Sequence, residues 1–180
     1  MHKAFKEVNF NRIVKYLIFG LWELIFKILP YSPLRIVWLK LGGVKIGKNC
    51  VVEAIDFFNL DRTGLNGLKI GNDCYLGAAA MLDLAGQITL EDQVSISAKS
   101  VILSHHSVGF KDHPLIKHYP KKIHHTRIKQ ATVIGIASII LPGITVGEKS
   151  LVAAGAVVRT NVPSQTMVAG VPAEVKKDLK

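Results

Sequence analysis

An aliphatic residue recurs at every sixth position through much of this 180-residue chain. The longest uninterrupted run comprises Ile128, Ile134, Ile140, Val146, Val152 and Val158. Earlier segments repeat the pattern with Ile46, Val52 and Phe58, then Ile70, Leu76 and Leu82, then Leu90, Ile96 and Ile102. Neither an amphipathic helix nor an alternating strand has a period of six. The chain is therefore limited to folds in which short similar units stack on one another.

A small or β-branched residue follows four positions after many of these aliphatic residues. The set includes Cys50, Cys74, Ala80, Ser100, Thr132, Ser138, Ser150 and Ala156. One large and one small side chain per unit fit a short strand and a turn, with the large side chain pointing inward. Three units close a triangular coil of about 18 residues, and stacked coils form a parallel β-helix. Both cysteines are read as small buried apolar residues of this repeat.

The repeat is interrupted between Ile102 and Ile128, and we expect a loop to leave the coil over about residues 104–127. Six of the seven histidines of the chain lie in this segment: His105, His106, His113, His118, His124 and His125. Binding and catalytic residues are concentrated on loops that a rigid scaffold positions. This loop is therefore the first place to look for chemistry.

The first 43 residues differ from the rest of the chain. Residues 10–29 are strongly apolar, but charged residues interrupt them at near-helical spacing, which predicts an amphipathic helix rather than a membrane span. A second short helix is expected to begin with Ser32 as its N-cap and to stop at Gly42. We assign residues 1–43 to a helical arm and residues 44–177 to the β-helix domain.

Charge is unevenly distributed. The chain has 23 Lys and Arg against 13 Asp and Glu, with 49% hydrophobic residues, a composition that excludes disorder as the main state. The basic excess lies in residues 1–48 and 104–130, which suggests anionic partners at two places. No groove-reading motif accompanies it, so nucleic acid is not expected. The arm has two interpretations that the sequence leaves open: it covers the β-helix or a neighbouring subunit, or it lies on an anionic membrane surface.

The two cysteines and the absence of a secretory signal pattern favour a cytoplasmic location, at the inner face of the membrane if the arm meets lipid. The C-terminal part carries the motifs Ile140-Leu141-Pro142-Gly143-Ile144-Thr145-Val146-Gly147, Ala153-Ala154-Gly155-Ala156-Val157-Val158 and Val168-Ala169-Gly170-Val171-Pro172-Ala173. With the repeat, they make residues 44–177 resemble the hexapeptide-repeat acyltransferases. Within that family the chain looks most like the O-acetyltransferases of sugars and polysaccharides, such as the galactoside, maltose and colanic-acid enzymes.

This resemblance implies a mainly β fold, a left-handed parallel β-helix, and a homotrimer with active sites in clefts between subunits. It also implies acetyl-CoA as the donor, no metal, and a histidine acting as general base where the chain leaves the coil. His105 matches that position best, and His106 is the alternative. A hydroxyl becomes a good nucleophile only as its proton is removed, and imidazole titrates near neutral pH, which suits this role.

Asp83 is the candidate for orienting the base. Leu82 and Ile102 both start repeat units, and the spacing between them predicts that Asp83 stacks beside Leu103. Binding the acceptor or capping a turn are alternative roles for Asp83. The positions that match the coenzyme cleft of the family are Gly135, Ile136, Ala153, Ala154, Arg159, Thr160 and Lys177.

We therefore expect an acetyl-CoA-dependent O-acetyltransferase acting on a sugar hydroxyl of a saccharide or a surface-polysaccharide precursor. Transfer to an amino sugar or another amine is one alternative. A metal-dependent enzyme resembling the hexapeptide-repeat carbonic anhydrases is another, for which His113 and His118 would be ligands. A non-catalytic scaffold is a third, because Val133 and Ala78 stand where the family usually has Trp and, in the galactoside enzymes, Asn.

Overall fold

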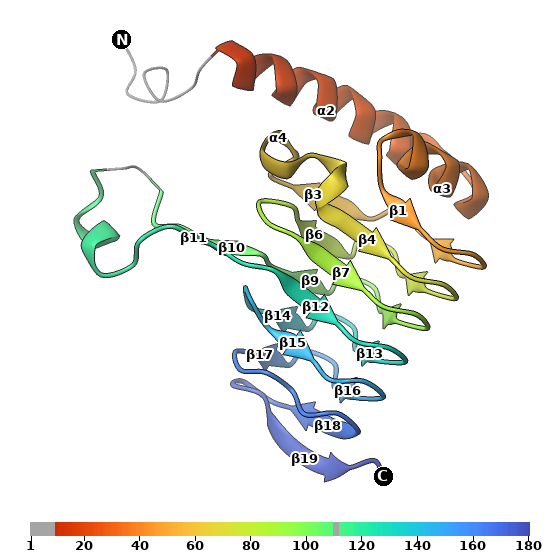
Figure 1. The fold of residues 1–180 in the computed structure, drawn as a ribbon, viewed down its shortest axis with the longest axis vertical. Coiled ribbons are helices and arrows are strands. Elements are labelled where there is room, and N and C mark those ends of the chain that lie inside the picture. The colour runs from red at the N-terminus through yellow and green to blue at the C-terminus, as the bar shows by residue number, and fades with distance from the viewer. Residues whose placement is uncertain (1–9, 110–111) are drawn as a thin grey trace.

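The computed structural model of the protein describes residues 10–109 and 112–180. Its body is a three-sided stack of coils, and each side is a sheet of parallel strands (Figure 1). The first sheet contains β1 (Lys45–Ile46), β4 (Leu68–Ile70), β7 (Ile88–Leu90), β12 (Thr126–Ile128) and β15 (Thr145–Val146). The second contains β2 (Val51–Val52), β5 (Tyr75–Leu76), β8 (Ser95–Ile96), β13 (Val133–Ile134), β16 (Leu151–Val152), β18 (Thr166–Ala169) and the antiparallel β19 (Glu174–Asp178). The third contains β3 (Asp56–Phe58), β6 (Met81–Asp83), β9 (Val101–Ile102), β14 (Ile139–Ile140) and β17 (Val157–Val158).

The six-residue period is the period of the core. Ile134 pairs with Ile96 on one side and Val152 on the other, so equivalent aliphatic residues stack from coil to coil. The repeat positions from Ile70 to Val158 are buried, which confirms the sequence prediction. Two earlier repeat positions differ: Ile46 is only partly buried, and Phe58 is 44% exposed, with Phe57 in the inward place beside Leu82. That unit is one residue shorter, because Phe57 follows Val52 by five positions, and the expected inward direction of Phe58 was wrong.

The small residues of the repeat lie at the corners, where their hydroxyls bond to backbone carbonyl oxygens of the same turn or of the neighbouring coil. The Thr132 hydroxyl donates to the Gly147 carbonyl at 2.7 Å, and the Ser138 hydroxyl donates to the Gly135 carbonyl at 2.7 Å. Cys74 is buried as predicted, whereas Cys50 is only partly buried. A small side chain at this place lets the chain turn without leaving a buried polar group unpaired.

Two helices, α2 (Phe10–Ile28) and α3 (Ser32–Leu41), lie across the end of the stack that begins with β1 (Figure 1). Phe26 and Leu39 are fully buried in the core, and Trp22 packs edge-on against Phe57 at 6.0 Å between ring centroids. The predicted cap is wrong, because the Ser32 hydroxyl instead accepts a hydrogen bond from Val52 N at 2.8 Å. The helix ends at Gly42 as expected. None of the described helices combines the length and apolarity that crossing a membrane requires.

Two irregular segments interrupt the coils. A short helix α4 (Leu60–Thr63) and the 3-10 turn η1 (Leu65–Gly67) lie between β3 and β4. A longer excursion leaves the stack after β9, as the break in the repeat predicted. It consists of β10 (His105–His106), antiparallel to β11 (Lys122–Ile123), and the 3-10 turn η2 (Pro114–Lys117) near its tip. It projects sideways from the body (Figure 1).

Candidate active site

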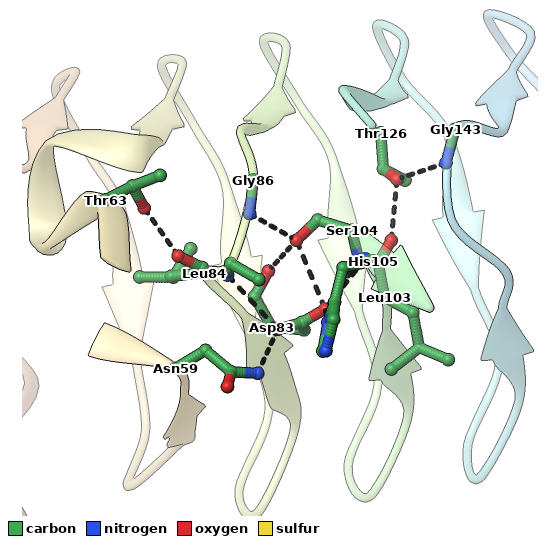
Figure 2. Close-up of polar contacts among 11 residues, drawn as sticks. Asn59, Thr63, Asp83, Leu84, Gly86, Leu103, Ser104, His105, Thr126 and Gly143 are labelled. Atoms are coloured by element: carbon green, nitrogen blue, oxygen red, sulfur yellow. Dashed lines mark hydrogen bonds and ion pairs between the residues drawn. The ribbon is translucent and has the colours of Figure 1, made fainter. Parts of the chain in front are cut away.

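The base of this excursion holds a histidine on a buried carboxylate. His105 Nδ1 lies 2.6 Å from Asp83 Oδ2, and the Asp83 side chain is almost completely buried (Figure 2). Their proximity follows from the coil register, in which Leu82 pairs with Ile102. Asp83 therefore lies directly beside the residues at which the chain leaves the stack, as the repeat spacing predicted.

Asp83 is held by donors on both carboxylate oxygens. Oδ2 also accepts from the backbone N–H groups of Ser104, at 2.9 Å, and His105, at 3.0 Å. Oδ1 accepts from Asn59 Nδ2 at 2.7 Å and from Ala85 N at 3.2 Å. Burial raises the pKa of Asp83, but these hydrogen bonds, led by that of His105, outweigh burial and bring the pKa below its ordinary value. The carboxylate is therefore charged at neutral pH.

The backbone on either side of the excursion is fixed as well. The Ser104 hydroxyl donates to the Asp83 carbonyl oxygen at 2.5 Å and accepts from Gly86 N at 2.8 Å. On the returning strand, the Thr126 hydroxyl donates to the Leu103 carbonyl at 2.6 Å and accepts from Gly143 N at 3.0 Å (Figure 2). Ser104 and Thr126 are fully buried. The base of the excursion is consequently part of the rigid stack.

In the His105 ring, Nδ1 is held by Asp83 and Nε2 is left free by the described residues to contact a substrate. The hydrogen bond to Asp83 defines Nδ1 as the protonated nitrogen of the neutral ring, which leaves the Nε2 lone pair available. Nε2 has no hydrogen-bond partner among the described residues. His105 also lines a cleft of about 420 Å³ whose walls include Leu103, His106, Tyr119 and Pro142. An acceptor hydroxyl or amine in this cleft could reach Nε2.

The other histidines of the excursion have separate surroundings. His106 is exposed and stacks on His124, with 5.6 Å between ring centroids. His113 Nδ1 accepts from Leu115 N and so caps η2. His125 Nε2 lies 2.8 Å from the Thr89 hydroxyl. Within the described parts of the chain, His105 is the histidine that is paired with a carboxylate.

The residues expected to bind the donor lie at two corners of the stack. Gly135 and Ile136 follow β13, and Ala153 and Ala154 stack against them one coil further on, after β16. Arg159 and Thr160 directly follow β17, which is the edge strand of the third sheet, and they line a pocket of about 350 Å³. A third position, Lys177 of β19, pairs with Met167 of β18 on the second sheet.

No three His, Cys, Asp or Glu side chains are grouped as a metal site within residues 10–109 and 112–180. His113 and His118, the pair considered as metal ligands, instead flank η2. Burial raises the pKa of the Cys74 thiol to about 11, so this thiol is protonated at neutral pH.

Sequence reasoning missed Asn59 and Ser104. Asn59 has a left-handed backbone with φ of 57° and immediately follows Phe58, which pairs with Asp83. The one-residue shift at Phe57 conceals this register in the sequence. Ser104 lies two positions after β9, and its proximity to Asp83 could have been found from the same spacing that placed Asp83 beside Leu103.

Comparison with known proteins agrees with the fold. Residues 37–54 and 126–159 match the family described as the hexapeptide repeat of succinyl-transferase. The fold matches galactoside acetyltransferase in complex with coenzyme A, with a TM-score of 0.79 and 20% identity over 97% of this chain and 85% of that chain. An Escherichia coli dTDP-4-amino-4,6-dideoxy-D-glucose acyltransferase is 26% identical over 73% of this chain and 70% of its own length.

A stronger but shorter match is to the 2,3,4,5-tetrahydropyridine-2,6-dicarboxylate N-acetyltransferase of Enterococcus faecalis, which is 50% identical over 52 residues, or 29% of this chain. The chain spans only 22% of that protein's length. The coils, their register and these matches define a left-handed parallel β-helix of hexapeptide repeats. The chain therefore resembles the hexapeptide-repeat acetyltransferases in its fold and in the matched repeats.

Proposed function

We propose that the protein is an acetyl-CoA-dependent acyltransferase that acetylates a hydroxyl of a saccharide, such as a surface-polysaccharide precursor. The observation that carries the proposal is the His105 imidazole, anchored at 2.6 Å on the buried Asp83 carboxylate and opening on a cleft. A base held in one tautomer with its second nitrogen free is what proton removal from an acceptor requires.

Each residue has a defined part in this mechanism. His105 Nε2 accepts the acceptor proton while the acceptor oxygen forms a bond to the acetyl carbonyl carbon. The carbon–sulfur bond then breaks, and His105 returns the proton to the departing thiolate, which leaves as the coenzyme A thiol. The negative charge of Asp83 stabilises the imidazolium that exists between the two steps. Transfer is direct in this mechanism, because neither cysteine thiol is hydrogen-bonded to a base among the described residues: the thiols of Cys50 and Cys74 donate to the backbone carbonyl oxygens of Gly71 and Glu91.

The donor fits the surface of the later coils. Gly135, Ala153 and Ala154 present little side chain at one corner, which lets an extended pantetheine approach the backbone. The exposed Arg159 and Lys177 can meet phosphates. Galactoside acetyltransferase, which has the same fold, binds coenzyme A.

A homotrimer is part of the proposal. Apolar residues at the outer face of the second sheet support it, because Val51, Tyr75 and Val133 are each about 40% exposed. A neighbouring subunit on this face would cover them and would add a second wall to the donor surface. Sedimentation equilibrium of the full chain measures the assembly, and a monomer at all concentrations would contradict it.

The test is acetyl transfer by the purified full chain. Acetyl-CoA is offered with free sugars, nucleotide-linked amino sugars and lipid-linked sugars, and both thiol release and product mass are followed. Calorimetry measures acetyl-CoA binding in the wild type and in His105→Ala. We expect binding to persist in the variant while transfer is lost, and His118→Ala to be the matched control with full activity. A wild type that binds no acetyl-CoA would overturn the proposal in favour of a scaffold.

N-acetylation of an amino sugar is a second candidate function. It is favoured by the E. coli acyltransferase on a 4-amino sugar, the relative that matches 73% of this chain. The same base serves both reactions, because an attacking amine also loses a proton. Mild alkali distinguishes the products, since an O-acetyl ester is hydrolysed and an amide survives.

A further inference from the structure

Three charged side chains of the N-terminal helices, Glu23, Lys27 and Arg35, contact the β-helix. On α2, Glu23 Oε1 accepts from Phe57 N at 3.3 Å, and Lys27 Nζ lies 2.6 Å from Asp56 Oδ1. Both contacts are made to the β-helix. The polar stripe of α2 is therefore used to attach the helix to the body, and its water-facing side is left without these charges.

The shorter helix repeats this arrangement. Arg35 is only 8% exposed, although arginine is seldom buried. Its guanidinium lies 3.2 Å from Glu53 Oε2 and 3.4 Å from the Val52 carbonyl oxygen. The Arg35 charge of α3 is thus also directed at the coil beneath it.

What the helices present outward is apolar. The outer apolar surface consists of large side chains that are each more than a third exposed: Phe10, Ile13, Val14, Tyr16, Leu17, Ile18, Leu21, Leu24 and Ile28 of α2, with Tyr31, Leu34, Val37 and Leu41 in or beside α3. Leu17 is 69% exposed and Ile28 is 70% exposed. Soluble monomers rarely expose apolar patches of this extent, and such patches mark sites of interaction.

The shape of the surface favours a planar apolar medium over a second helix. A helix pair needs a narrow apolar seam bordered by charged positions. Leu17, Leu21 and Leu24 follow seam spacing, but Ile13 and Ile18 beside them are also apolar and exposed. The apolar face is therefore too broad for one partner helix, whereas a lipid surface contacts a broad face evenly.

Charge at this end of the molecule specifies the kind of lipid. In residues 10–60 the acidic side chains are Glu23, Glu53 and Asp56, and each has a cationic partner in Lys27 or Arg35. Four further lysines of the same end are exposed and have no carboxylate within ion-pair distance among the described residues: Lys15, Lys40, Lys45 and Lys48. Unpaired cations around an apolar surface are suited to anionic headgroups.

We propose that α2 and α3 dock the protein peripherally on an anionic lipid bilayer. The outer apolar surface enters the boundary between headgroups and acyl chains, and the exposed lysines contact lipid phosphates. The helices lie in the plane of the membrane, and the coils extend away from it toward β19. Tyr16 and Tyr31 provide rings with a polar tip, which are favoured at that boundary.

The experiment is flotation of the full chain with vesicles of phosphatidylcholine alone or with 30% phosphatidylglycerol. It requires no acetyl transfer, so it stands or fails separately from the proposed function. We expect the wild type to float with the anionic vesicles, and less at high salt. Leu17→Gln with Leu24→Gln should weaken partitioning about 100-fold, since each buried leucine side chain contributes more than tenfold. Lys15→Gln with Lys40→Gln should weaken it about 20-fold on anionic vesicles.

The matched control is Leu115→Gln with Ile123→Gln, which replaces two side chains of comparable exposure, 47% and 54%, on the excursion. It should float like the wild type. Circular dichroism checks folding of every variant, and the lysine pair decides the question should the leucine pair fail to fold. Three results would overturn the proposal: a wild type that floats with neither vesicle, equal loss in the control, or a drop in particle mass by light scattering in the leucine variant without vesicles. The last result would identify a second copy of the chain as the occupant.

Discussion

The base and the tip of the excursion contain the same residue type in different surroundings. At the base, His105 rests on the buried Asp83, and three successive coils contribute donors to that carboxylate through Asn59, Ala85 and Ser104. At the tip, His113 is held by a hydrogen bond to a residue two positions away. A histidine acquires a fixed orientation only where stacked coils support it. The excursion is therefore a catalytic candidate at its base and a surface loop at its tip.

Replacing His105 should have the largest effect on activity. His105→Ala removes the proposed base, so we expect transfer to fall about 1,000-fold with acetyl-CoA binding unchanged. The measurement is the steady-state rate at saturating donor. If His105→Ala stays within threefold of the wild-type rate while His106→Ala is inactive, the general base is His106. The contrast between the base and the tip of the excursion would then rest on the wrong histidine.

Replacing Asp83 should affect both stability and activity. Asp83→Asn places an amide NH2 among N–H donors, which leaves buried groups unpaired. We expect the free energy of unfolding to fall by about 3 kcal/mol. Loss of the fixed ring orientation should lower the rate about 100-fold. Urea unfolding and the same rate assay check the two effects, and a fully stable Asp83→Asn protein would show that the network does not anchor the excursion.

Asn59 should have an intermediate effect. Asn59→Ala removes one hydrogen bond of 2.7 Å to the charged Asp83 carboxylate, and water can partly replace it because Asn59 is only half-buried. We expect a loss of about 1.5 kcal/mol in the free energy of unfolding and less than a tenfold loss in rate. A larger rate loss with unchanged stability would indicate that Asn59 contacts the acceptor directly.

Acid should remove the stability that the charged Asp83 carboxylate contributes. The pKa of Asp83 is lowered in the folded protein, so its contribution to stability is complete above the unfolded pKa near 3.9 and is lost as the pH falls through the folded value. Below about pH 4, the free energy of unfolding of the wild type should fall more steeply with pH than that of Asp83→Asn. The two slopes should differ by less than about 1.4 kcal/mol per pH unit, because one group titrates. Urea midpoints between pH 2 and 7 measure this difference, and parallel curves would contradict it.

The tip should tolerate change. His113→Ala removes the side chain that accepts from Leu115 N, an exposed contact worth about 0.5 kcal/mol. The His118 side chain makes no hydrogen bond to the described residues, so His118→Ala removes none. Both variants should keep the wild-type rate within twofold. A rate loss of tenfold or more in either variant would make the tip part of the acceptor site. The contrast between the tip and the base of the excursion would then disappear.

The sequence by itself determined the β-helix, because a six-residue period has one large inward side chain per unit and few other folds use it. It also determined where the excursion begins and that Asp83 stacks near Leu103, since both follow from counting units. It placed the helical arm and its end at Gly42. These inferences succeed because parallel coils turn distance along the chain into position in space.

Only the tertiary structure decided the details that depart from the period. Phe57 rather than Phe58 points inward, because that unit is one residue shorter, and this shift brings Asn59 to Asp83. Ser32 accepts from Val52 N instead of capping its helix. The direction of the arm was also undetermined, because helical spacing separates polar and apolar faces without saying which one meets the body. The ion pairs of Lys27 and Arg35 with the coils settle it and turn the apolar face outward.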